Sequence, residues 1–232
     1  NLHFSSKNTT ILLDQFDGKA VIDADYSTIT VRDIKQSLLI RSASGTIKVD
    51  DVGGDLTVQS DYTTITVNNV KGMLNVEDKS GMIRARGMDG AVIDGQYSTM
   101  EIADVWGKAG KVIALDGQSG SITLSNATGD VRINNPYGII DLKDIRGKVE
   151  VQSKSSNIRA TGVTGDWSST TEYSQVTLRD LSAKRITVSN SSSPIDITLK
   201  TVPTDVEIRN EYGTVTLSMP PGFSGEVDIN VT

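Results

Sequence analysis

Residues 55–72 read DLTVQSDYTTITVNNVKG, and this stretch holds two short runs in which apolar and polar side chains alternate. Leu56 and Val58 are the apolar members of the first run, and Ile65 and Val67 those of the second. Alternation with a period of two places one face of a β-strand inward and the other in water. The stretch therefore predicts two half-buried strands joined by a turn.

The same pattern recurs at nearly equal steps along most of the chain. The apolar residue that follows each turn is Ile29, Ile47, Ile65, Ile83, Met100, Ile122, Ile140, Ile158, Val176, Ile195 or Val215. One such unit cannot bury its apolar face alone, whereas stacked units share a continuous core. The sequence predicts an all-β parallel β-solenoid of eleven 18-residue units, a single-stranded β-helix whose default crossover is right-handed.

A second regularity overlies the first. We call the apolar residue that follows each turn the anchor, and the position three residues before the anchor alternates between tyrosine and serine. All six tyrosines of the protein fall there: Tyr26, Tyr62, Tyr97, Tyr137, Tyr173 and Tyr212. The result is a 36-residue super-repeat, which leaves two geometries open. Either each unit makes one turn, with tyrosine beside serine, or a pair of units makes one wide turn and the tyrosines form an unbroken ladder. Because cross-strand neighbours commonly pair like with like, we favour the wide turn.

The domain organisation follows from where the pattern holds. Residues 1–232 are expected to form a single solenoid domain, with the repeats over residues 20–218. Residues 1–19 match the pattern only weakly, and Pro220 and Pro221 interrupt it near the other end. Because solenoids need atypical terminal units to protect open strand edges, we expect residues 1–19 and 219–232 to be caps.

Composition excludes several classes of function. The net charge of −6 has both signs scattered along the chain, which argues against a nucleic-acid partner. The lack of cysteine excludes disulfides and thiolate sites, and no apolar run approaches the ~20 residues of a membrane span. His3 is the only histidine, so a Ser-His-Asp triad or a histidine metal site has no credible members. We expect no catalytic residue, no metal and no cofactor.

The chain resembles a bacterial family of adhesin-like domains of unknown function, related to the head domains of auto-transporter adhesins. The resemblance rests on residues 55–58 (DLTV), on residues 62–67 (YTTITV) and on the closing stretch 213–221, GTVTLSMPP. It implies a β-solenoid of the cell envelope in an extracytoplasmic location: the periplasm, the outer-membrane surface or the medium. It supplies no catalytic residues.

The tyrosine series is the most informative candidate site. A strip of rings along one edge could stack on sugar rings or contact an aliphatic patch of a partner. The alternative is a corner or core ladder that fills space and fixes the register between turns.

The 22-residue step in the repeat contains an insertion near residues 106–111, WGKAGK. Insertions in solenoids map to loops, so Trp106 with Lys108 and Lys111 could contact an anionic glycan. Alternatively, Trp106 folds back over the adjacent turn. Trp167 instead occupies an inward position of a first strand, which predicts a core residue.

Acidic and amide residues recur at the turns. They are Asp25, Asp33, Asp50, Asp51, Asp61, Asp104, Asp144 and Asp180, with Asn68 and Asn69 in the equivalent positions of one unit. Stacked acids can hold calcium, but the Gly-Gly-x-Gly-x-Asp signature of calcium-binding solenoids is missing. Turn formation by Asp and Asn side chains explains these residues more simply.

These observations favour a non-enzymatic envelope protein, an adhesin-type rod that binds a glycan or another envelope protein. Two alternatives stay open. One is a β-helical carbohydrate-active enzyme, either a lyase or a hydrolase, which would need paired carboxylates or an acid–base cluster on one face. The other is a structural spacer that supports another domain.

Overall fold

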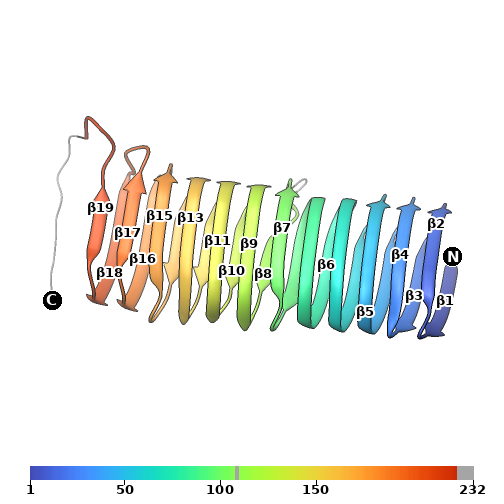
Figure 1. Cartoon of the computed structure of the whole chain (residues 1–232). Helices are drawn as coiled ribbons and strands as arrows, with labels where there is room; N and C mark the ends of the chain where they lie inside the picture. The colour runs from blue at the N-terminus through green and yellow to red at the C-terminus, as the bar shows by residue number, and fades with distance from the viewer. Residues whose placement is uncertain (108–109, 224–232) are drawn as a thin grey trace.

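The computed structural model describes residues 1–107 and 110–223, which form one elongated stack of strands with β1 at one end and β19 at the other (Figure 1). Within these residues all regular structure is β-strand. The strands are β1 (Leu2–Lys7), β2 (Thr10–Phe16), β3 (Ala20–Asp25), β4 (Ser27–Ile34), β5 (Leu38–Val52), β6 (Leu56–Gly95), β7 (Thr99–Val105), β8 (Ile113–Asp116), β9 (Ser119–Thr128), β10 (Val131–Asn134), β11 (Tyr137–Arg146), β12 (Val149–Gln152), β13 (Ser155–Thr164), β14 (Trp167–Thr170), β15 (Gln175–Leu181), β16 (Arg185–Ser192), β17 (Ile195–Leu199), β18 (Asp205–Tyr212) and β19 (Val215–Ser218). The predicted parallel β-solenoid is confirmed.

The register of the strands fixes the length of a turn. Every pairing between named strands is parallel, and most join residues 18 positions apart, such as Ile47 with Ile65 and Ile140 with Ile158. The 36-residue wide turn is therefore wrong. Tyr62 lies beside Ser44 in the adjacent turn, so each tyrosine has serine, not tyrosine, as its neighbour. Like-with-like pairing fails as a guide here because this position is at an exposed corner, where no packing forces neighbours to match.

The solenoid begins earlier than residue 20. Strands β1 and β2 pair with β3 and β4 in the regular register, with Leu2 beside Ala20 and Ile11 beside Ile29. The region expected to be an N-terminal cap thus contains a complete turn, which gives about 12 turns in place of eleven. At the other end the last paired strand is β19, and residues 224–232 of the predicted C-terminal cap lie outside the described residues.

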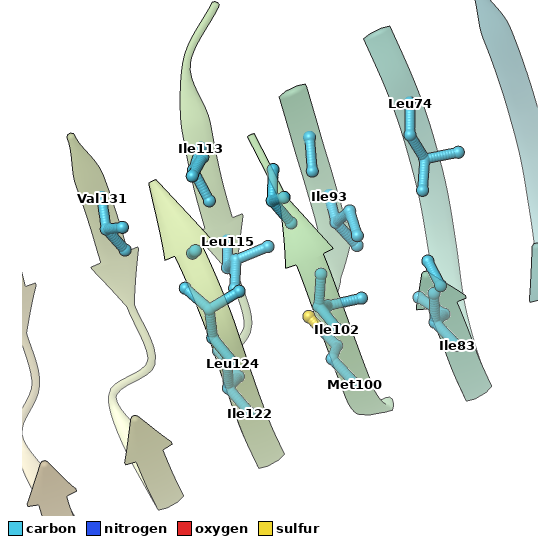
Figure 2. Close-up of a cluster of buried hydrophobic side chains, with 14 of the residues drawn as sticks. Leu74, Ile83, Ile93, Met100, Ile102, Ile113, Leu115, Ile122, Leu124 and Val131 are labelled. Atoms are coloured by element: carbon cyan, nitrogen blue, oxygen red, sulfur yellow. The ribbon is translucent and has the colours of Figure 1, made fainter. Parts of the chain in front are cut away.

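Each turn directs aliphatic side chains from both of its strands into one continuous core. Figure 2 shows this for successive turns, where Leu74, Ile93 and Ile113 from the first strands and Ile83 and Ile122 from the second strands belong to one buried cluster. These side chains are at most 1% exposed. Trp167 is 1% exposed and its indole N–H donates to Ser169 Oγ at 3.1 Å, which confirms it as a core residue.

One of the two connections in each turn repeats a left-handed backbone conformation. It involves one residue per turn, with φ between 52° and 76°: Gln15, Asp33, Asp51, Asn69, Gly87, Asp104, Asn126, Asp144, Gly162 and Asp180. Asn, Asp and Gly tolerate this conformation better than other residues. Their side chains also join adjacent turns, as where Asn69 Nδ2 donates to Asp51 Oδ1 at 3.0 Å. We call this edge the Asx corner.

The Asx corner confirms the turn interpretation for Asp33, Asp51, Asp104, Asp144 and Asp180. The remaining acids have other surroundings. Asp50 accepts a hydrogen bond from Asn68, whereas Asp25 and Asp61 lie at the opposite end of the turn.

Replacing Trp167 by Ala should lower the free energy of unfolding by about 3–5 kcal/mol, because a large buried side chain would leave a cavity in the core. Urea denaturation followed by circular dichroism measures the change. Trp106→Ala is the matched control: its side chain is 45% exposed, so its midpoint should move much less. Equal shifts for the two variants would contradict this account of the core.

Candidate functional site

The tyrosines lie at the other connection of each turn, between the first and the second strand. We define the tyrosine corner as the row formed by Tyr26, Tyr62, Tyr97, Tyr137, Tyr173 and Tyr212 with the intervening Ser44, Ser80, Ser119, Ser155 and Ser192. All six tyrosines are exposed, from 51% for Tyr137 to 71% for Tyr212. The tyrosines therefore do not form a ladder in the core; they occupy a corner with their rings in solvent, where a structural ladder at the corner stays the alternative to a binding role.

Because serine separates the tyrosines, the faces of successive tyrosine rings do not contact one another. Tyrosines in every second turn are about 9.6 Å apart, twice the ~4.8 Å between strands. Aromatic pairs interact at centroid distances of about 4.5–7 Å, so successive rings do not stack. The hydroxyl of Tyr97 donates instead to Gln118 Oε1 of the next turn at 3.4 Å.

Beneath the tyrosines runs a row of buried polar side chains that sequence reasoning missed. It consists of Ser27, Ser42, Thr63, Asp78, Ser98, Asn135, Ser156, Thr171, Ser174 and Asn190, which together with Ser169 are the buried polar residues of the described chain. Most of these side chains form hydrogen bonds with the backbone or with each other. Ser27 Oγ, for example, accepts from the N–H of Thr9 at 3.1 Å and donates to the carbonyl of Asp25 at 2.8 Å. We call this row the polar spine. Its signal in the sequence is a small polar residue directly after several of the tyrosines, which turn propensity alone also explains.

Asp78 is the one carboxyl group in the polar spine of the described chain. It is 3% exposed and accepts hydrogen bonds from Ser60 Oγ at 2.7 Å, from Ser98 Oγ at 2.9 Å and from the backbone of Thr63. Burial raises the pKa of Asp78 above its usual value, and these hydrogen bonds offset part of that effect. The carboxyl group thus joins successive turns and is turned away from solvent.

A shallow groove of about 430 Å³ runs beside the first three tyrosines. It is lined by Asp25, Arg41, Ser42, Ala43, Gln59, Ser60, Asp61, Glu77, Asp78, Lys79, Asp94 and Gln96. The lining residues come from three neighbouring positions in successive turns. The side chain at the middle position is short in several turns (Ser42, Ser60), and the longer side chains at the two flanking positions form the walls of the groove. We call this the corner groove.

Acidic residues outnumber basic ones in the corner groove. The two basic residues are paired: Lys79 Nζ lies 2.8 Å from Asp61 Oδ1, and Arg41 Nη1 lies 3.1 Å from Asp23 Oδ1. Burial raises the pKa of Asp94, and the nearby carboxylates of Asp116 and Glu77 raise it further. Carboxyl groups thus gather at this end of the groove, where Glu77 and Asp94 line it and Asp116 lies beside Asp94 in the next turn.

The insertion loop lies away from this site. Trp106 follows strand β7 just beyond Asp104 of the Asx corner, and its backbone N–H donates to the carbonyl of Met88 at 3.0 Å. Lys111 Nζ is 4.0 Å from a carboxylate oxygen of Asp89, and Lys108 lies outside the described residues. The structure thus brings the tyrosines together but does not add Trp106 to them.

Neither a metal-binding cluster nor a membrane-spanning helix is found in the described part of the chain. Over residues 1–107 and 110–223, no three His, Asp or Glu side chains are grouped so that they could hold a metal ion. The same residues contain no helix of the length and apolarity needed to cross a membrane.

Residues 107–232, more than half of the chain, match the sequence model of the family described as Toastrack DUF4097. The chain belongs to the Toastrack DUF4097 family. The stacked parallel turns agree with the Toastrack description, and the turns before residue 107 continue in register with those after it, as in the pairing of Met100 with Ile122. Among curated proteins and solved structures, no relative matches this Toastrack chain. The family match gives no support to a relationship with adhesins or auto-transporters.

Asp78→Asn tests the buried carboxyl group through the pH dependence of stability. Because the pKa of Asp78 is raised in the folded state, this group favours folding below its unfolded-state pKa of about 4, and that contribution is lost as pH rises through the folded-state pKa. Relative to Asp78→Asn, which cannot ionise, the wild-type protein should lose stability as pH rises from about 4. Urea midpoints of both proteins across this range measure the difference. A difference that does not change with pH would show that Asp78 ionises as easily in the folded protein as in the unfolded chain.

Proposed function

We propose that this Toastrack domain is a non-enzymatic, extracytoplasmic binding protein of the cell envelope, and that the tyrosine corner is its binding edge. The proposal includes an adhesin-type role, in which a rigid solenoid presents that edge to a glycan or to another envelope component. The envelope location comes from the family resemblance of the sequence. The binding edge comes from the exposure of the tyrosines.

One observation carries the proposal: six large aromatic side chains project from one edge of the solenoid and are 51–71% exposed. Exposed aromatic residues that gather on one surface are typical of binding sites, since each ring offers a large apolar contact at a low cost in side-chain entropy. The polar spine below holds the backbone of this corner, so the rings are carried on a rigid support.

The surroundings of the acids support the non-enzymatic part of the proposal. A glycosidase needs two carboxyl groups that reach the substrate. In the corner groove Asp78 is buried and its oxygens are engaged by Ser60 and Ser98, while Asp61 is paired with Lys79. Glu77 accepts a hydrogen bond from Gln59 Nε2 at 3.3 Å. These three acids are thus held by structural contacts, and none of the three is placed as a general acid facing a nucleophile.

Replacing Tyr26, Tyr62 and Tyr97 together by Ser should abolish or strongly weaken binding to bacterial envelopes. Serine is the residue that this corner already carries in alternate turns, so the substitution removes the rings without disturbing the fold. The measurement is co-sedimentation of purified protein with isolated bacterial cell envelopes, quantified against protein concentration.

The matched control replaces Thr30, Thr66 and Thr123 by Ser. These residues lie between inward-facing positions of second strands, on a polar face away from the corner. This control should sediment like the wild-type protein. If the tyrosine variant also does so, the tyrosine corner is not the binding edge.

A further inference from the structure

The first three tyrosines border the corner groove, although none of them is among the residues that line it. Asp25, Asp61 and Gln96 line the groove, and each is directly followed in the chain by a tyrosine: Tyr26, Tyr62 and Tyr97. Groove and rings extend together over five turns, about 19 Å along the solenoid axis at ~4.8 Å per turn. A ligand in this groove would therefore be long and narrow and would lie parallel to the axis.

The spacing of the rings matches a ligand with a regular repeat. Tyrosines about 9.6 Å apart offer one apolar platform every second turn. Two sugar units of an extended β-1,4-linked chain span a comparable length. In such a chain the apolar C–H face of one pyranose per repeat can lie on each ring, while the hydroxyls between the rings face the groove.

The groove offers the polar groups that sugar hydroxyls need. Gln96 provides an amide that both donates and accepts, whereas the amide of Gln59 is already bridged between Arg41 and Glu77. Asp25 accepts from the N–H of Ala43 and Asp61 contacts Lys79, and a carboxylate keeps further acceptor positions for sugar hydroxyls. The two glutamines and the two aspartates stand on strands or on the corner above the polar spine, so their positions are set by the repeat. Small Ser42 and Ser60 in the floor leave the depth that a chain needs.

Charge narrows the class of saccharide. Glu77 and Asp94 line the groove, and Asp94 lies beside Asp116 of the next turn; these carboxylates would repel uronic acids, sulfates or phosphates and would attract an amine. Tyrosine faces also attract cations. The groove is thus suited to a neutral or amine-bearing chain, in contrast with the anionic glycan that Trp106 and its lysines suggested from the sequence.

We infer that the corner groove binds an extended β-1,4-linked saccharide of neutral or amine-bearing sugars, laid along the axis with its rings on Tyr26, Tyr62 and Tyr97. This inference rests on the proposed function, since it names the ligand class of the same edge. It also distinguishes the first three tyrosines from Tyr137, Tyr173 and Tyr212, which lie beyond the groove.

The test uses three soluble hexasaccharides and isothermal titration at about pH 6, where amines are protonated and carboxylates ionised. They are β-1,4-linked N-acetylglucosamine, β-1,4-linked glucosamine and β-1,4-linked glucuronic acid, so that the linkage is the same and the charge differs. We expect the neutral chain to bind, the amine-bearing chain to bind about three- to tenfold more tightly at low salt, and the uronic chain not to bind. The preference for the amine should shrink as salt is added, because exposed charges are screened.

Two variants separate the rings from the charges. Tyr62→Ser should weaken both the neutral and the amine-bearing chain by about tenfold. Glu77→Gln with Asp94→Asn should remove the preference for the amine, so that the neutral and the amine-bearing chain bind with similar affinity. The matched control is Thr66→Ser, which lies on the same strand β6 as Tyr62 but outside the tyrosine corner and the groove, and which should bind the neutral and the amine-bearing chain as the wild-type protein does.

The outcomes distinguish this inference from the proposed function. If none of the hexasaccharides binds while the triple tyrosine variant still loses envelope binding, the ligand class is wrong and the binding edge stands. Equal weakening by Tyr62→Ser and Thr66→Ser, or binding of the uronic chain as tight as that of the amine-bearing chain, would also overturn the inference. If the triple variant binds envelopes normally and no hexasaccharide binds, both proposals fail.

Discussion

The pairing of each strand with the strand one turn away is the constraint on which the structure depends. Parallel hydrogen bonding between residues 18 positions apart places identical positions of successive turns side by side. Inward positions then form aliphatic columns, and their burial drives the stacking. Because the register is fixed by the core, every outward position also forms a column. The row of tyrosines is a consequence of this order and needs no interaction of its own to align it.

The two connections of each turn meet different demands. The Asx corner bends the backbone through a left-handed residue, and Asp, Asn or Gly serve there for conformational reasons. At the tyrosine corner polar side chains and backbone groups point inward. The side chains of the polar spine form hydrogen bonds with most of these groups, as Ser27 and Asp78 do. The Asx corner therefore needs Asp, Asn or Gly for its backbone conformation, whereas the polar residues of the tyrosine corner are buried below a row of exposed rings. This difference is why the second edge can present an apolar surface without weakening the fold.

Much of the fold could be predicted because the residues of each core column recur in the sequence at steps of about 18 residues. The anchors from Ile29 to Ile195 are all buried, and Trp167 fits the column of Leu38 and Val149 as expected. The length of the turn could not be predicted, since equally spaced anchors suit both geometries and the alternation of Tyr62 with Ser44 favours the wide turn whenever like residues are expected to pair. The exposure of the tyrosines depends on which way the corner bends. The corner groove depends on three positions in several turns, whose combination no local pattern reveals.

The unequal steps of the repeat show how such an architecture can change over evolution. A 22-residue step separates Met100 from Ile122, and a 17-residue step separates Ile83 from Met100, yet all three remain in one column. Chain length can thus vary at the Asx side while the opposite edge stays aligned. Segments acquired after Val105 would project as separate appendages, and descendants of one ancestral solenoid could diversify there without altering the edge that carries the tyrosines.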